Sequence, residues 1–298
     1  MNSTAHFHLP GLFEFYEFYR LFLPLFRKHR KYFYSWCDIT SIYGCPEGCI
    51  WAGGRIENST CNLEDVFNLL NEYKISARLT FSNSLLKEEH LADKKCNSIC
   101  KLFENSKTQN GVIIYSDLLL QYIKKNYPRF YFVSSTTKVL NNFNDFTNEL
   151  NKKDFTFVVP DFRLNKLHED LKKLNKNQKD KVEFLCNECC WIKCNDRKKC
   201  YENVSHKNLG EDCRDHICRA PFGNYGYKFS LAMQNPSFIG IEEIQNFYLP
   251  NSFSNFKIEG RSLGSAMLLE FILYYLTKPQ YHIHVREALY LDSMLDLF

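Results

Sequence analysis

The 298-residue sequence is poor in the features that mark membrane-spanning, modular and nucleic-acid-binding proteins. No stretch reaches the roughly 18–20 apolar residues of a membrane span; the nearest, residues 264–276, is short and carries Glu270. Glycine (12) and proline (9) are few and dispersed, which excludes a flexible linker and predicts one domain over residues 1–298. The net charge is only +4, too small to indicate a nucleic-acid or anionic-membrane partner.

Signature motifs of zinc peptidases and nucleotide-binding proteins are also missing. The chain has no HExxH and no glycine-rich phosphate loop after a strand. His282 and His284 alternate near the C terminus, where we expect a surface segment rather than a metal site. Residues 1–10 lack the basic and long apolar regions of a secretory signal, which predicts a cytoplasmic protein.

Cysteine, in contrast, is abundant and unevenly distributed. The chain has 13 cysteines, an odd number that, without a signal peptide, argues against a secreted, disulfide-bonded protein. Seven of them fall between residues 186 and 218. In a reducing compartment, such clustering indicates metal or redox chemistry.

Eight short runs rich in β-branched and aromatic residues predict strands. These runs are residues 38–43, 75–82, 111–115, 130–134, 155–160, 182–186, 227–232 and 256–258. Segments with helical spacing separate most of them, for example those that follow Asn62 and Ser116. Eight such units in roughly 250 residues predict a single-domain α/β fold, a (β/α)8 TIM-like barrel. We place its core at about residues 37–278; an open doubly wound sheet is the alternative.

Two cysteine pairs follow the predicted sixth strand: Cys190 and Cys194, then Cys213 and Cys218. Both pairs fall on loops at the carboxyl end of that strand, where four thiolates can surround one metal centre. Spacers of three and four residues favour an iron–sulfur cluster, with zinc and unligated thiols as alternatives. Three further cysteines in the same window are alternative ligands: Cys186, Cys189 and Cys200.

A second cysteine motif, Cys45-Pro-Glu-Gly-Cys49, follows the first predicted strand. It resembles part of the CxxxCxxC loop of radical-SAM enzymes, but Ala52 stands where the third cysteine belongs. A redox or substrate role for this pair and a plain tight turn are the two interpretations. Cys96 and Cys100 lie in a predicted helix, where their spacing indicates packing on one face.

Polar residues just after strands are the remaining candidates for a site, because in a barrel they converge at one mouth. Asn187 and Glu188 follow the sixth predicted strand, and Glu259 and Arg261 follow the last. An acid and a base separated only by Gly260 are suited to binding a paired or bidentate ligand.

The segment FKIEGRS, residues 256–262, resembles the hallmark of the collagenase-like peptidases, family 32 of the U-type peptidases. The order of the other features agrees with that family: DITSIYG ending in GGR, GVIIYSDLLL, FVSSTTKVLN, VEFLCNECC, CRDHICR and FSLAMQNPSFIGIEEI. The resemblance covers roughly residues 37–278.

The resemblance implies a barrel whose four cysteines hold a 4Fe-4S cluster. Carried over by position, the pairs match Cys190 with Cys194 and Cys213 with Cys218, and Arg219 takes the position of the arginine that follows. The family's first pair is usually more widely spaced, which keeps the alternative ligands open. Relatives include oxygen-independent hydroxylases of ubiquinone precursors and of RNA bases, some of them heterodimers, besides the proteolysis that gives the family its name.

We therefore expect a cluster-dependent enzyme that hydroxylates or otherwise modifies a small or modified substrate without oxygen. Its expected catalytic residues are Glu188, Glu259 and Arg261, and its expected substrate-binding residues are Arg55, Asn187 and Arg219. Two alternatives are a peptidase or peptide-processing protein, and a non-catalytic, cluster-bearing subunit that pairs with a related barrel.

Overall fold

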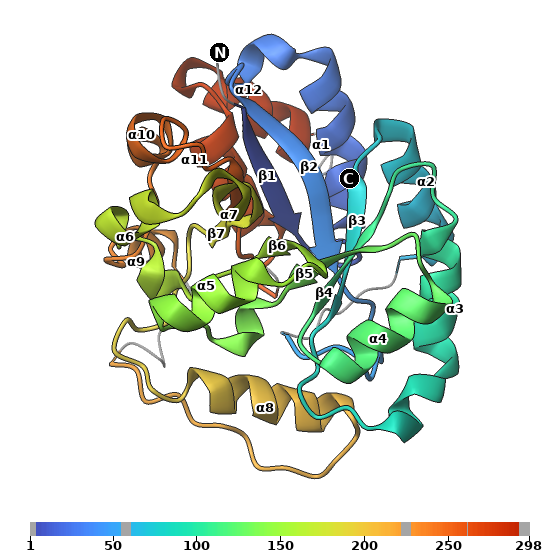
Figure 1. Ribbon diagram of the computed structural model, residues 1–298. Helices are drawn as coiled ribbons and strands as arrows, with labels where there is room; N and C mark the ends of the chain where they lie inside the picture. Colours follow the sequence, from blue (N-terminus) through green and yellow to red (C-terminus); the bar gives the residue numbers. More distant parts are fainter. Residues whose placement is uncertain (1–3, 55–60, 222–227, 261, 292–298) are drawn as a thin grey trace.

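The computed structural model describes residues 4–54, 61–221, 228–260 and 262–291. Within them, eight parallel strands alternate with helices and curve into a nearly closed barrel (Figure 1). The strands are β1 (Ala5–Pro10), β2 (Cys37–Gly44), β3 (Ser76–Phe81), β4 (Gly111–Ile114), β5 (Tyr131–Ser134), β6 (Phe155–Val158), β7 (Glu183–Leu185) and β8 (Asn255–Lys257). The sheet order is β6-β5-β4-β3-β2-β1-β8-β7, and a parallel bridge from Val158 to Val182 brings its two edges together. The predicted (β/α)8 barrel is confirmed.

Helices surround the strands and connect them in sequence. They are α1 (Tyr16–Lys28), α2 (Leu63–Tyr73), α3 (Lys94–Glu104), α4 (Asp117–Asn126), α5 (Phe143–Asn151), α6 (His168–Lys173), α7 (Lys176–Lys181), α8 (Arg197–Asn208), α9 (Phe229–Met233), α10 (Ile241–Glu243), α11 (Ser265–Leu276) and α12 (His282–Arg286). Short 3-10 or π turns are η1 (Arg30–Tyr32), η2 (Glu88–Ala92), η3 (Thr136–Lys138), η4 (Phe162–Leu164), η6 (Ile244–Tyr248), η7 (Pro279–Tyr281) and η8 (Glu287–Leu291).

Side-chain caps fix where several helices begin. The Asn62 side chain accepts a hydrogen bond from the Glu64 backbone N–H at the start of α2, and Ser116 accepts one from Leu119 at the start of α4. Each cap satisfies an amide that the first helical turn leaves without a partner. Both helix starts are where the sequence predicts them.

One strand prediction is wrong, and one strand was not predicted, so the total of eight is unchanged. The segment 227–232 was expected to be a strand, but within its described part Phe229 begins helix α9. The missing strand is β1, whose alternation of His6 and His8 with Phe7 and Leu9 has the period of a strand. It lies between β2 and β8, so the barrel begins well before residue 37. The cysteine-rich segment therefore follows the seventh strand rather than the sixth.

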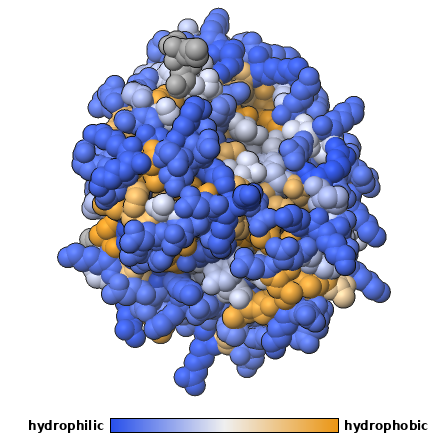
Figure 2. Space-filling model, in the orientation of Figure 1, coloured by the Kyte–Doolittle hydropathy of each residue, from blue (hydrophilic) through white to orange (hydrophobic). Residues whose placement is uncertain are grey.

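The carboxyl ends of the strands define the face on which a site is expected. In Figure 1 the β1 and β2 arrows run toward α8, which lies across that end of the barrel. On the face of the molecule shown in Figure 2, apolar side chains are interspersed among polar ones. Over the described ranges, no helix combines the length and apolar character that crossing a membrane requires.

Candidate active site

A cavity of about 680 Å³ lies at the carboxyl ends of the strands, bounded on one side by α8. Hydroxyl-bearing residues such as Ser82 and Thr137 line it from the loops after β3 and β5. Lys257 from β8 and Glu259 just beyond it contribute charged groups, and Trp191 contributes an aromatic surface. A concave site of this size at this end of a barrel is where ligands bind in proteins of this architecture.

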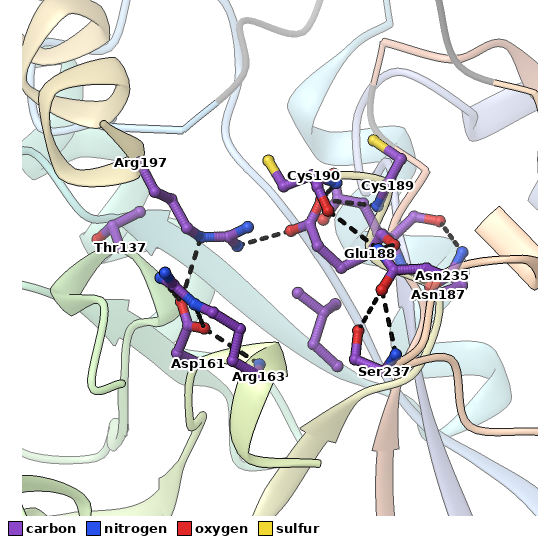
Figure 3. Close-up of polar contacts among 12 residues, drawn as sticks. Thr137, Asp161, Arg163, Asn187, Glu188, Cys189, Cys190, Arg197, Asn235 and Ser237 are labelled. Atoms are coloured by element: carbon purple, nitrogen blue, oxygen red, sulfur yellow. Dashed lines mark hydrogen bonds and ion pairs between the residues drawn. The ribbon is translucent and has the colours of Figure 1, made fainter. Parts of the chain in front are cut away.

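A chain of four charged residues, the mouth network (Asp161, Arg163, Glu188 and Arg197), lies beside the cavity (Figure 3). Arg197 Nη2 donates to Glu188 Oε2 at 2.6 Å, and Arg197 Nε lies 3.5 Å from Asp161 Oδ2. Arg163 Nε and Nη2 donate to the two Asp161 oxygens at 2.6 and 3.0 Å. Two cations thus balance two largely buried carboxylates at the edge of the cavity, where charge pairing is stronger than on an open surface.

The mouth network fixes the backbone of the cysteine-rich segment. Glu188 Oε1 accepts hydrogen bonds from the backbone N–H groups of Cys189 (2.9 Å) and Cys190 (3.1 Å). Arg163 Nη1 donates to the Cys194 carbonyl at 2.9 Å. Asn235 Nδ2 donates to the carbonyl oxygens of Glu188 (3.0 Å) and Cys190 (2.9 Å). The side chains of Glu188, Arg163 and Asn235 therefore hold the loop after β7 in place.

Arg197 is the first residue of α8 and anchors that helix to the barrel. Its guanidinium carbon lies 4.8 Å from the centre of the Phe162 ring and 5.4 Å from that of Tyr201. Burial alone would lower the pKa of Arg197, but the nearby Glu188 carboxylate leaves that pKa raised. The far half of α8 is tied down by Asn83, whose Nδ2 donates to the Ser205 carbonyl at 3.1 Å.

Five thiols line the cavity: three come from the segment before α8, one from α8 itself and one from the segment after it. They are Cys189, Cys190, Cys194, Cys200 and Cys218. Burial, followed by the nearby Cys194 and Cys218 thiols, raises the pKa of Cys200 to about 11. The structure thus brings three of the four predicted metal ligands to one cavity and adds Cys200, which the sequence offered only as an alternative.

The fourth predicted ligand, Cys213, lies elsewhere. Its Sγ contacts the Asn203 carbonyl at 3.8 Å and is not part of the cavity lining. Asn203 is likewise not among the residues that line the cavity. Arg219, predicted to bind substrate, lies with Asn203 around a separate hollow.

The other predicted site residues divide into three groups. Glu188 and Glu259 both line the cavity. Asn187 is fully buried beneath it, where its amide exchanges two hydrogen bonds with the Glu259 backbone, at 2.9 and 2.7 Å, and so joins the ends of β7 and β8. Arg55 and Arg261 lie outside the described residues.

A second set of buried charges, the lumen network (His8, Arg78, Glu183 and Lys257), lies inside the barrel. Arg78 Nη1 donates to Glu183 Oε2; His8 Nε2 and Lys257 Nζ each lie 3.7 Å from the same carboxylate. Burial opposes ionisation of Glu183, yet Arg78 and His8 lower its pKa to about 2. Burial and the positive charge of Arg78 lower the pKa of His8 well below its ordinary value. Lys257 also lines the cavity, so this network forms part of its floor.

Sequence reasoning missed most of the two charged networks. Asp161 was identifiable as a polar residue after a strand, but Arg163 and Arg197 sit in segments that resemble solvated loops. Arg78 and Glu183 lie inside short strands, where a charged residue would be assigned to an exposed face. Their roles depend on barrel closure, which brings β3 within reach of β7.

The chemistry of the cavity thiols suits a thiolate-ligated metal centre, but they are not gathered around one point. Across the part of the chain that the structure describes, no group of three or more His, Cys, Asp or Glu side chains is placed to hold a metal ion. The soft-donor set fits an iron–sulfur cluster or zinc better than a hard cation. Binding a metal would require the thiol-bearing loops to draw closer together.

Comparison with known proteins gives little further guidance. No family model matches the sequence, and no curated protein matches it. Among solved structures, the chain is similar to the U32 peptidase Mk0906, with 12% sequence identity, 86% of this chain and 92% of that chain covered, and a TM-score of 0.49. Similarity at this level supports no functional assignment, and membership of the collagenase-like peptidase family stays a prediction.

Proposed function

We propose that this protein is an enzyme that binds a small or modified substrate in the cavity at the barrel mouth and uses a 4Fe-4S cluster to hydroxylate or otherwise oxidise or reduce it without oxygen. The observation that carries the proposal is the gathering of five thiols around one cavity beside a buried, charge-balanced network. Structural cysteines are normally packed in a core, whereas cysteines that bind metals face a cavity or one another.

The cluster ligands that we propose are Cys190, Cys194, Cys200 and Cys218. This set replaces Cys213, the ligand expected from the sequence, with Cys200, because Cys200 lines the cavity and Cys213 does not. Cys189 also lines the cavity, but its side chain and that of its neighbour Cys190 diverge, so we assign only one of the two. A bound cluster would supply one-electron transfer or Lewis acidity at the cavity wall.

The protein's own groups would position the substrate and move protons. We assign proton transfer to Glu259, which is 7% exposed and lines the cavity. Lys257 at the cavity floor would stabilise a negatively charged or strongly polar substrate group. Arg55 and Arg261 remain predicted partners for such a group. The cavity volume suits a small molecule or a single extruded residue or base rather than a folded protein.

Anaerobic purification with iron and sulfide reconstitution tests the proposal. We expect a brown protein with about four irons per chain, as this cluster type requires. Cys200→Ser should lose most of that iron, whereas the matched Cys213→Ser variant, from the same segment but not part of the cavity lining, should retain it. A colourless protein with one zinc per chain, or iron loss caused by Cys213→Ser and not by Cys200→Ser, would contradict the proposal.

The hydrogen-bonded pair of Ser41 and His8 does not support the peptidase alternative. The Ser41 Oγ and His8 Nδ1 atoms lie 2.8 Å apart, as in a nucleophile and its base, but both residues are fully buried in the barrel and neither lines the cavity. Peptide hydrolysis that persists in the Cys190→Ser, Cys194→Ser double variant would favour the peptidase.

A further inference from the structure

A second pair of thiols, unconnected with the cavity, lies between the loop after β2 and helix α3. The Sγ atoms of Cys49 and Cys96 are 2.9 Å apart, about 0.9 Å longer than a disulfide bond of about 2.04 Å. Cys49 is 2% exposed and Cys96 is fully buried. Neither residue lines the cavity, so this pair is independent of the cluster site proposed above.

The scaffold, rather than the thiols themselves, holds the two sulfurs together. On the helix side, Asp93 caps α3 by accepting a hydrogen bond from the Cys96 backbone N–H at 2.7 Å. On the loop side, the Cys49 carbonyl accepts a hydrogen bond from the Ala52 backbone at 3.0 Å. The Trp51 indole, two residues after Cys49, donates to the His90 carbonyl at 2.8 Å and so ties the loop to the segment before α3. The two cysteines are thus fixed opposite each other by separate contacts.

We propose that Cys49 and Cys96 form a reversible dithiol–disulfide site that takes a hydroperoxide as its oxidant. Both thiols are buried, and burial raises the pKa of Cys49, so oxidation requires the loop after β2 to open; hydrogen peroxide then oxidises one thiol to a sulfenic acid and releases one water. The second sulfur attacks the sulfenic sulfur, the S–S bond forms, and the hydroxyl leaves with the thiol proton as a second water. Two thiols and one hydrogen peroxide therefore give one disulfide and two waters. The short distance makes condensation with the partner thiol faster than further oxidation.

In this proposal Cys49 pairs with Cys96, whereas its sequence motif suggests Cys45 as the partner. Cys45 also lies near enough to hydrogen-bond to the Cys49 thiol, so a Cys45–Cys49 bond is the competing product. The Cys49–Cys96 bond is the one that links two elements. It would join α3 to the loop in which the Ala52 carbonyl accepts a hydrogen bond from Asn208 at the end of α8, at 2.7 Å. Oxidation at this site would thereby stiffen the support of the helix that covers the cavity.

Peptide mapping of the full-length protein after hydrogen peroxide treatment tests the proposal. Trypsin cleaves after Lys31, Arg55, Lys95 and Lys101, so residues 32–55 and 96–101 should be recovered as one cross-linked pair without reduction and as two peptides after it. We expect most of both peptides in the cross-linked form. Recovery of both as unlinked peptides, at a peroxide dose that oxidises the cavity thiols, would overturn the proposal.

Single variants identify the sulfurs, because the first peptide also contains Cys37 and Cys45 and the second also contains Cys100. Cys45→Ser and Cys100→Ser should leave the cross-link intact, whereas Cys49→Ser and Cys96→Ser should abolish it. A cross-link that survives in Cys96→Ser, or an internal Cys45–Cys49 bond in the wild-type peptide, would overturn the assignment. If a variant fails to fold, fragmentation of the wild-type cross-linked pair still identifies the bonded residues.

Discussion

The mouth network and the lumen network use the same chemistry, an arginine paired with a buried carboxylate, but they connect different parts of the molecule. In the lumen, Arg78 on β3 reaches Glu183 on β7, so the pair spans the barrel. At the mouth, Arg197 at the start of α8 reaches Glu188 and Asp161, which follow β7 and β6. The comparison indicates that the first network supports the barrel itself, whereas the second supports the loops that carry the cavity thiols.

The largest effect should come from breaking the lumen pair. Arg78→Met leaves the Glu183 carboxylate buried without its arginine, and we expect a loss of about 3–5 kcal/mol in the free energy of unfolding, measured by urea denaturation. The double variant Arg78→Met, Glu183→Met should recover much of that loss, because no buried charge then lacks its partner. A single variant within 1 kcal/mol of wild type would show that the lumen pair does not support the barrel.

Breaking the mouth pair should cost less. Arg197→Met deprives Glu188 of its cation, but Glu188 lines the cavity, where water can solvate it, and Asp161 keeps Arg163. We expect a loss of about 1–3 kcal/mol. Native-state hydrogen exchange should rise in the segment after β7 and in α8 but not in the strands. Equal exchange increases in the strands would erase the distinction between the two networks.

Lowering the pH should reduce the stability that the lumen network provides. Because the pKa of His8 is lowered in the fold, the unfolded chain binds a proton near pH 6.5 that the folded chain does not. The stabilisation is present above pH 6.5 and is lost as the pH falls, with a slope of up to about 1.4 kcal/mol per pH unit. His8→Asn should remove that part of the slope between pH 6.5 and 5 in urea titrations. An unchanged slope would mean that His8 titrates normally in the fold.

The smallest effect should come from Asn235, which holds the cysteine-rich loop without carrying charge. Asn235→Ala removes the two hydrogen bonds donated to the carbonyls of Glu188 and Cys190 and the two that Asn235 Oδ1 accepts from Ser237, and we expect a loss of about 1–2 kcal/mol. Alkylation of Cys190 by iodoacetamide in the native protein should become faster, while that of the core thiol Cys100 stays slow. Equal acceleration at both thiols would point to global rather than local loosening.

The fold was largely predictable because it depends on patterns that are local in sequence. Buried parallel strands are continuous apolar runs, and a capping residue marks where a helix begins, as at Asn62 and Ser116. Strand β1 escaped detection because its histidines suggest a polar extension, although His8 is fully buried in the barrel. The apolar, aromatic segment at 227–232 has strand-like composition, yet β7 pairs directly with β8, which leaves no place for a strand between them.

The site was predictable only where residues near in sequence act together. Glu188, Cys190 and Cys194 follow one strand, so their convergence could be expected. The choice between Cys200 and Cys213 depends on the side of α8 that faces the cavity, and α8 is polar around most of its surface, which leaves no periodic signal to orient it. Likewise, no local pattern pairs Cys49 with Cys96, which are 47 positions apart in sequence.

The position of β1 constrains the order in which this protein can be completed during synthesis. Residues 6–8 pair with residues 255–257, so β1 receives its second neighbour only after the segment that contains β2 to β7 has been made. Until Glu183 and Lys257 have been made, His8 and Arg78 lack these neighbours. A chain truncated before Glu183 would therefore place Arg78 in an open sheet without the carboxylate that pairs with it. Complete barrel assembly is therefore a late, long-range event.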